Sequence, residues 1–241
     1  MLAGSRVVVI VPAFREEAHV ADVIATMPAF VDAIVLVDDG SPDRTALRAR
    51  ATRDPRLFVE RHLKRRGVGA ALVTGYRRAL ALTTGPADAL CVMAADGQMA
   101  PDELEQVALP VVRGVADYVK GNRFGHPTVR RSMGLGRWTG GQVFTTLTSV
   151  AIGQKISDSQ CGFTALSRRA ALELDLDGLW PGFGYPNDLL GQLAARRLRV
   201  REVPVRPIYG DEKSKLRLRH LPPIFWLIGR AAVRRRFGAP R

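Results

Sequence analysis

An alternation of continuous apolar runs with helical patterns is the feature that most constrains how this chain can fold. A helical pattern follows each of the apolar runs at 7–13, 33–40, 57–62 and 89–96. Strands buried on both faces of a sheet give such runs, and an intervening helix returns the chain so that the next strand pairs in parallel. The alternation predicts an α/β fold with a mostly parallel central sheet and helices on both faces.

The second half of the chain is less regular. Residues 132–153 are apolar, rich in glycine and β-branched, and their pattern indicates neither a helix nor a strand. A short strand is predicted near 163–167, and a further strand over 200–209 contains Pro204 and Pro207. Because proline cannot donate a hydrogen bond to a neighbouring strand, we expect this last strand at an edge of the sheet.

The net charge of +13 is concentrated at one end of the chain. Between Lys213 and Arg241 there are nine Lys or Arg and no Asp or Glu. We therefore expect one globular domain over 1–212 and a basic amphipathic segment over 213–241. Residues 222–237 interleave apolar and basic side chains at helical spacing, which fits a helix lying on an anionic membrane surface. The alternative is a last helix packed on the domain.

Composition also argues against several classes of protein. No stretch approaches the roughly 20 apolar residues that span a bilayer, and the first residues lack the features of a secretory signal. We expect a cytoplasmic protein attached peripherally to the inner face of the plasma membrane.

Cys91 and Cys161 have no C-x-x-C spacing, which predicts reduced structural thiols. The chain lacks the stacking platform, zinc-finger and basic-zipper patterns of nucleic-acid readers, so we expect no nucleic-acid partner.

Polar side chains follow several of the predicted strands. The carboxyl ends of parallel strands meet at one rim of the sheet, where α/β proteins bind their ligands. A carboxylate there can accept hydrogen bonds from a nucleobase or a ribose, although Asp39 could instead cap the following helix. The side chains expected at the rim are Glu16, Asp38, Asp39, Asp96, Gln98 and Arg123.

Residues 94–98, AADGQ, place a carboxylate and an amide oxygen two residues apart. Mg²⁺ is usually held by one or two carboxylates together with substrate phosphates, so Asp96 and Gln98 would suffice for Mg²⁺ or Mn²⁺ on a diphosphate. The alternative is a simple turn at Asp96, with Asp102 capping the next helix. The glycine-rich stretch 65–69 matches neither a dinucleotide fingerprint nor a P-loop, and it predicts a helix that begins close to the rim.

Taken in order, these stretches resemble the family-2 glycosyltransferases of the GT-A fold, in the dolichyl-phosphate mannosyltransferase-like branch that acts on polyprenyl phosphates. Three residues depart from the family pattern: Arg15 replaces a usual Asn, Val68 a frequent Lys, and Ala94 the usual first acid. The missing acid predicts weaker metal binding in the absence of nucleotide. The matching stretches cover nearly the whole chain and lie at 11–17, 37–45, 94–104, 120–123, 158–170, 201–205 and 214–217.

The resemblance implies transfer of a sugar, with inversion, from a GDP- or UDP-sugar to a polyprenyl phosphate of the dolichyl or undecaprenyl type. It implies that Asp96 and Gln98 hold the metal and that Asp96, Arg123 and Arg131 are catalytic. The acceptor phosphate would contact Arg123, Arg130, Arg131 and Ser214. The nucleotide-sugar would contact Pro12, Phe14, Glu16, Asp38, Asp39, Ala95, Asp96, Arg206 and Lys215. Many relatives carry transmembrane helices, whereas this sequence contains no stretch of that kind. We therefore expect peripheral attachment, with a separate membrane-anchoring subunit as a further partner.

Two other functions fit the same residues. A phosphate acceptor is already ionised, whereas a hydroxyl acceptor must lose a proton during attack and needs a base. Asp188 could be that base in a glycosyltransferase for saccharides; alternatively it is a first-turn helix charge behind Asn187 as N-cap. Ala94 raises the further alternative of a pseudoenzyme that binds a nucleotide-sugar without turnover.

Overall fold

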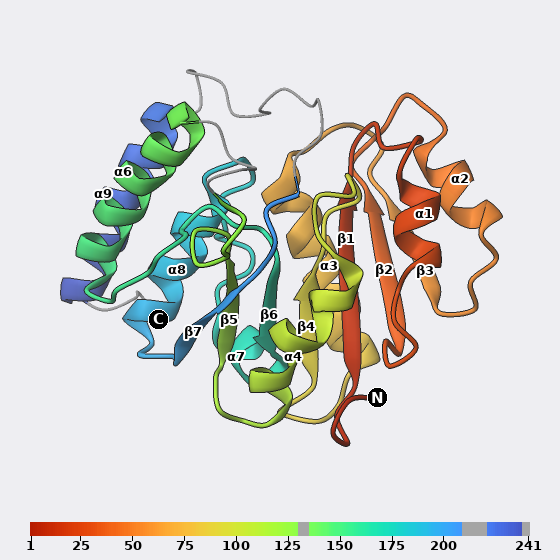
Figure 1. Cartoon of the computed structure of the whole chain (residues 1–241), viewed down its shortest axis with the longest axis horizontal. Helices are drawn as coiled ribbons and strands as arrows, with labels where there is room; N and C mark the ends of the chain where they lie inside the picture. Colours follow the sequence, from red (N-terminus) through yellow and green to blue (C-terminus); the bar gives the residue numbers. More distant parts are fainter. Residues whose placement is uncertain (130–134, 209–220, 238–241) are drawn as a thin grey trace.

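A seven-stranded sheet forms the centre of the computed structural model, which describes residues 1–129, 135–208 and 221–237 (Figure 1). The strands lie in the order β3-β2-β1-β4-β6-β5-β7, and β6 pairs antiparallel with both of its neighbours. The predicted α/β fold with a mostly parallel sheet is confirmed. The strands are β1 (Val7–Ala13), β2 (Ala33–Asp38), β3 (Leu57–Arg61), β4 (Ala89–Val92), β5 (Tyr118–Asn122), β6 (Thr164–Ser167) and β7 (Val200–Pro204).

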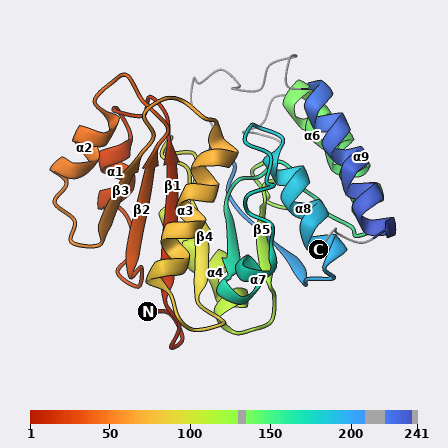
Figure 2. The same cartoon turned by 180° about the vertical axis from the view of Figure 1, so that it is seen from behind.

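Helices cover both faces of the sheet (Figures 1 and 2). Val7, Val9 and Val11 of β1 pack with α1, α2 and α4, whereas Val8 and Ile10 pack with α3, α7 and α8. Successive side chains of one strand therefore enter two separate cores. The helices are α1 (Val20–Ala25), α2 (Thr45–Ala51), α3 (Val68–Leu82), the 3₁₀ turn η1 (Pro101–Glu103), α4 (Leu104–Val112), α6 (Leu135–Ile152), α7 (Arg168–Glu173), α8 (Tyr185–Ala195) and α9 (Leu221–Phe237).

Strand β7 pairs only with β5 in the sheet order, so the predicted edge position is confirmed. The unassigned stretch 132–153 contains helix α6. Its hydroxyl side chains bond within the helix: Thr148 Oγ1 donates to the Phe144 carbonyl at 2.7 Å, and Ser149 Oγ to the Thr145 carbonyl at 2.8 Å. Because α6 packs on α8 and α9, tertiary contact stabilises a helix that its own periodicity does not reveal.

Helix α9 packs on the domain, as the alternative reading of this segment proposed. It lies beside α8 and α6 (Figures 1 and 2). The apolar side chains that we expected to face a membrane are buried: Ile224, Leu227, Ile228 and Ala231. Among the described residues, no helix is both long enough and apolar enough to cross a membrane.

The contact between α8 and α9 depends on a small residue. A Cβ atom placed on Gly191 would lie 2.7 Å from Ala231 Cβ, whereas one on Gly229 would meet no atom within 4 Å. We predict that Gly191→Ala lowers the free energy of unfolding by about 1–3 kcal/mol, because the helices must separate. Gly229→Ala should raise it by up to about 1 kcal/mol through helix propensity. Urea denaturation measures both, and equal effects of the two variants would contradict the packing described.

Candidate active site

The rim of the sheet where β1, β2 and β4 end is the candidate active site. The strand order reverses at β1, with β2 on one side and β4 on the other, and both pair with it in parallel. Open α/β sheets bind ligands beyond the carboxyl ends of their strands at such a point. Phe14, Asp39 and Asp96 follow these three strands along the chain, so the structure brings these predicted residues to one rim.

The carboxylate of Asp39 organises the glycine-rich loop. Its oxygens accept hydrogen bonds from the backbone N–H groups of Arg66 and Gly67, both at 2.8 Å, and Oδ1 lies 2.8 Å from His62 Nδ1. Gly67 has a φ of 104°, a conformation that favours glycine, and α3 starts at the next residue. The prediction that a helix begins close to the rim is confirmed. The alternative that Asp39 caps α2 is wrong, because its partners lie before α3.

The loop after β1 is fixed by β2 and α2. The N–H of Arg15 donates to Ser41 Oγ at 3.0 Å, and that of the buried Glu16 to Thr45 Oγ1 at 2.9 Å. Arg15 has a φ of 61°, in a region where Asn is enriched, so the departure from the family's Asn places an unfavourable residue there. Asp38 is buried; its carboxylate accepts from the Ser41 N–H at 2.9 Å and pairs with an arginine of β3, Arg61.

The guanidinium groups of two arginines lie over the ring of Phe14 at the rim. The Cζ atom of Arg65 lies 4.2 Å from the ring centroid and that of Arg15 lies 5.4 Å from it. Cations over an aromatic face are attracted by the quadrupole of the ring. Pro12 pairs with Val37 inside the sheet. Two positive charges therefore lie over the Phe14 ring beside the end of β1, which suits a ligand that carries phosphates.

The turn after β4 contains the predicted metal ligands. Asp96 Oδ1 accepts a hydrogen bond from the Gln98 N–H at 3.2 Å, and Gly97 between them has a φ of 71°. Ala95 is buried beneath the turn. No cluster of three His, Cys, Asp or Glu that could hold a metal occurs in 1–129, 135–208 and 221–237. A carboxylate and an amide oxygen suit a hard cation such as Mg²⁺ or Mn²⁺ when phosphates supply further ligands.

Arg206 follows β7 and reaches the segment just beyond this turn. Its guanidinium pairs with Asp102 and, at 3.2 Å, with Glu103, while its backbone N–H donates to Glu103 at 2.9 Å. In this structure Arg206 therefore joins the end of β7 to η1. Its predicted contact with the donor stays a prediction.

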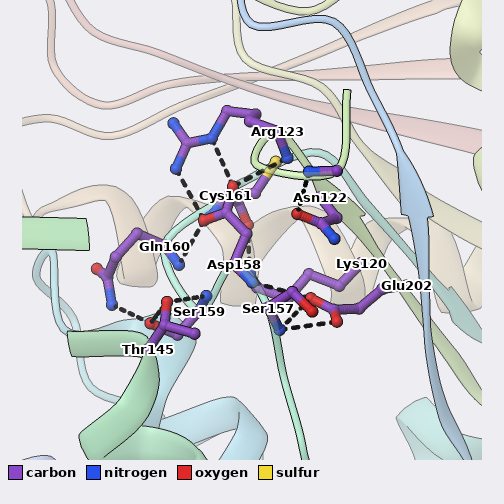
Figure 3. A network of polar contacts seen from close by, with 11 residues as sticks. Lys120, Asn122, Arg123, Thr145, Ser157, Asp158, Ser159, Gln160, Cys161 and Glu202 are labelled. Carbon is purple, nitrogen blue, oxygen red and sulfur yellow. Dashed lines mark hydrogen bonds and ion pairs between the residues drawn. The ribbon is translucent and has the colours of Figure 1, made fainter. Parts of the chain in front are cut away.

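A buried polar network supports Arg123 at the end of β5 (Figure 3). Asp158 is 0% exposed, and its carboxylate accepts from Arg123 Nε at 2.7 Å and from Nη2 at 3.0 Å. Glu202 in turn accepts the Asp158 N–H at 3.0 Å, and Lys120 Nζ donates to the Cys161 carbonyl. Such a bidentate pair fixes the plane of the guanidinium. Arg123 is thus held in place, and its predicted contact with an acceptor phosphate stays a prediction.

The partners of Arg123 were missed by sequence reasoning. The stretch 158–170 contributed to the family resemblance, but no role was assigned to Asp158. Its pairing joins positions 35 residues apart, which no local pattern reveals. Burial also lowers the pKa of Lys120. Lys120, a basic residue inside a strand, was the signal that could have revealed a buried polar network here.

Asp188 and Asn187 lie inside α8 and are buried. The helix begins at Tyr185, so the prediction of Asn187 as N-cap is wrong; its side-chain oxygen lies 2.8 Å from Thr148 Oγ1 of α6 instead. Asp188 Oδ2 accepts the Trp180 N–H at 2.9 Å. Its Oδ1 accepts from two arginines of α9, Arg230 and Arg234. The residue proposed as a base therefore has both carboxylate oxygens occupied.

Four predicted residues lie outside the described residues: Arg130, Arg131, Ser214 and Lys215. Their roles at the acceptor and donor phosphates stay predictions.

Comparison with known structures places this geometry in the GT-A fold. The crystal structure of glucosyl-3-phosphoglycerate synthase from Mycobacterium tuberculosis, in complex with Mn²⁺, UDP and phosphoglyceric acid, superimposes with a TM-score of 0.70 at 21% identity. The match covers 99% of this chain and 81% of that one. At this level of identity the likeness shows the fold.

Two relatives align over most of both chains. The UDP-N-acetylglucosamine–dolichyl-phosphate N-acetylglucosaminyltransferase of Methanococcus voltae is 27% identical over 225 residues, which are 87% of this chain and 88% of that protein. The undecaprenyl-phosphate mannosyltransferase of Micrococcus luteus is 29% identical over 215 residues, or 83% and 82% of the two chains. Residues 8–174 match the glycosyl transferase family 2, so the chain belongs to this family and is a glycosyltransferase.

The Arg123–Asp158 pair gives a prediction for stability. Burial raises the pKa of Asp158, but the Arg123 guanidinium and Lys120 more than offset this and hold the pKa below its usual value. A group whose pKa is lowered by folding stabilises the protein above its ordinary pKa, and this contribution is lost as the pH falls through the folded-state value. We therefore expect Asp158→Asn to lower the free energy of unfolding by about 3 kcal/mol at pH 7.

Urea denaturation at several pH values measures this effect. The difference between the wild type and Asp158→Asn should shrink as the pH falls below about 4, because the Asp158 carboxylate of the unfolded wild type then takes up a proton, whereas that of the folded protein, with its lowered pKa, is still ionised. Asp22→Asn, at an exposed aspartate of α1, is the control and should change stability by no more than about 0.5 kcal/mol. A difference for Asp158→Asn that is constant from pH 7 to pH 3 would contradict the ion pair.

Proposed function

We propose that this glycosyltransferase moves a sugar from a GDP- or UDP-sugar to a polyprenyl phosphate at an anionic membrane surface. The observation that carries the lipid acceptor is an exposed apolar face on α6 and α9. Helix α6 also lines a hollow together with Asn122 and Phe124, the two neighbours of Arg123 in the chain. Both relatives described above are named for lipid phosphate acceptors, which supports the same class. The separate anchoring subunit has no support in these comparisons.

In the proposed reaction an oxygen of the acceptor phosphate attacks C1 of the donor sugar. The new C1–O bond forms as the bond from C1 to the diphosphate breaks, and the nucleoside diphosphate leaves with the electron pair. A divalent cation held by Asp96 and Gln98 would stabilise the charge on that diphosphate. The known structures of the fold that contain UDP together with Mn²⁺ or Mg²⁺ agree with this chemistry.

The state of Asp188 favours a phosphate acceptor over a hydroxyl acceptor. A phosphate monoester is largely ionised at neutral pH, by analogy with the second pKa of about 6 in phosphoproteins, so it needs no base. A hydroxyl group would need one. Asp188 is 1% exposed, and its oxygens are bonded to Trp180, Arg230 and Arg234. A base in this position would first have to release a guanidinium.

The exposed apolar face consists of side chains from two parallel helices. The contact of Phe144 with Phe225, at 5.6 Å between ring centroids, joins α6 to α9. Arg235 at the far end of α9 donates to the Val150 carbonyl at 3.1 Å. A monomer that exposes contiguous apolar groups presents a site for a membrane or a partner. The exposed side chains of the α6–α9 face are Val143, Leu147, Val150, Phe225, Trp226 and Val233.

Radiolabel transfer tests the proposed activity. Purified protein is mixed with undecaprenyl phosphate, a panel of labelled UDP- and GDP-sugars, and Mg²⁺, Mn²⁺ or EDTA. We expect label from one donor in the organic phase, dependent on the metal. Asp96→Asn should reduce the rate about 100-fold, because charge on the leaving group is no longer stabilised. Glu105→Gln, at an exposed acid of α4, is the matched control and should leave the rate unchanged.

The other outcomes of this assay separate the alternatives. The assay is repeated with a saccharide or phosphoglyceric acid as the acceptor, and label on one of these, with none in the lipid, would replace the polyprenyl acceptor with a water-soluble one. Donor binding without turnover on any acceptor would indicate the pseudoenzyme. An Asp96→Asn variant with wild-type, metal-dependent activity would contradict the assignment of the metal site.

Vesicle binding tests the membrane face. Val143→Glu and Val233→Glu place a carboxylate on the α6–α9 face, and Leu172→Glu places one at an equally exposed apolar position on α7. On vesicles that contain anionic lipid, we expect the double variant Val143→Glu/Val233→Glu to bind about tenfold or more weakly than the wild type. Apolar burial is lost in this variant, and the anionic surface repels the added charge. Leu172→Glu should bind like the wild type. Equal binding by all variants in a sedimentation assay would refute this face.

A further inference from the structure

Asp188 of α8 joins the loop just before its own helix to α9, where its two arginine partners lie 42 and 46 residues further along the chain. From α8 it binds the backbone of Trp180 and the two arginines of α9. The same segments also meet through rings: the Trp180 and Trp226 centroids lie 6.0 Å apart, and Arg230 Cζ lies 5.0 Å from the Trp226 ring. One buried carboxylate thus holds the loop before α8 and the helix α9 together.

The loop held by Asp188 supports the start of α3. The Pro181 carbonyl accepts hydrogen bonds from the N–H groups of Gly69 at 2.8 Å and Ala70 at 3.3 Å. The approach is close enough that a Cβ atom on Gly69 would lie 2.0 Å from the Trp180 carbonyl oxygen. The 180–181 loop and the first turn of α3 are therefore in direct contact.

The start of α3 is also bonded to the donor rim. Immediately before it, the N–H groups of Arg66 and Gly67 donate to Asp39. The connection runs from α9 through Asp188 to the 180–181 loop, then to the glycine-rich loop and Asp39. The contacts between these segments are hydrogen bonds, ion pairs or ring contacts, and the chain itself completes the connection within each loop.

We propose that Asp188 is a positioning residue for the donor site, which fixes the glycine-rich loop by holding α9 and the 180–181 loop in place. The inference rests on the proposed function, because it assigns the rim beside Asp39 to the nucleotide. It gives Arg230 and Arg234 a structural role inside the protein and couples the membrane-facing helix to donor binding. Removing one partner of a buried ion pair leaves a charge uncompensated, so the three charged groups act as a unit.

The first test measures hydrogen exchange in the absence of any ligand. Asp188→Asn and the double variant Arg230→Met/Arg234→Met should both increase amide exchange over residues 66–70 about tenfold, a shift typical of energetic coupling between neighbouring segments. The control is Arg48→Met/Arg50→Met, which removes two exposed arginines of α2 and should leave this exchange unchanged. Unchanged exchange over 66–70 in a folded Asp188→Asn protein would overturn the proposal.

The second test measures binding of UDP and GDP with Mn²⁺ by calorimetry. We expect Asp188→Asn and the double arginine variant to weaken binding by similar factors, and the triple variant to be no weaker than either, because the groups act as a unit. If Asp188 were instead a base, Asp188→Asn would abolish turnover with unchanged nucleotide binding, and the double arginine variant would bind nucleotide normally. That pattern would overturn the positioning role.

A third variant covers the case in which Asp188→Asn does not fold. Asp188→Leu/Arg230→Met/Arg234→Met replaces the ion group by apolar side chains, a change that proteins often tolerate. It removes the acceptor of the Trp180 N–H, so faster exchange over 66–70 is again expected, and wild-type exchange would overturn the proposal.

If the wild type binds neither UDP nor GDP, the proposed function fails, whereas hydrogen exchange still decides whether Asp188 fixes the loop.

Discussion

A carboxylate withdrawn from water must be met by N–H groups or by cations, and this requirement arranges the rim of the sheet. Asp39 is satisfied by the glycine-rich loop, Asp158 by Arg123, and Asp188 by Trp180 and two arginines of α9. In each case the partner comes from a different segment of the chain. The buried acids therefore fix the relative positions of the loops that surround the proposed donor and acceptor sites.

The same constraint links the two halves of the protein. The regular half supplies β1, β2 and β4, whose ends form the rim proposed for the donor, while the less regular half supplies α6, α8 and α9. Arg123 stands at the junction, at the end of β5 and against Asp158 (Figure 3). A lipid phosphate that approaches from the α6–α9 face would meet a sugar nucleotide bound over β1 and β4. The proposed function would therefore use both the apolar surface and the charged rim.

Sequence reasoning succeeded where the signal was local. The continuous apolar runs located the strands of the first half, Pro204 indicated an edge strand, and the glycines at 67 and 69 indicated the start of α3. It failed where the signal was a distant partner. Helix α6 is stabilised by α8 and α9, and Asn187 bonds to that helix rather than capping its own. The periodicity of α9 identified the apolar stripe that the helix buries, but could not show that α8 and α6 cover it.

The most direct measurement of the central claim is a crystal structure with UDP or GDP and Mn²⁺, in which anomalous scattering locates the metal. We predict that Mn²⁺ binds Asp96, Gln98 and the diphosphate. The nucleoside should lie over the rim beside Asp39, and the glycine-rich loop should keep the position that it has in this structure. Mn²⁺ and nucleotide bound elsewhere on the protein, with this rim unoccupied, would contradict it.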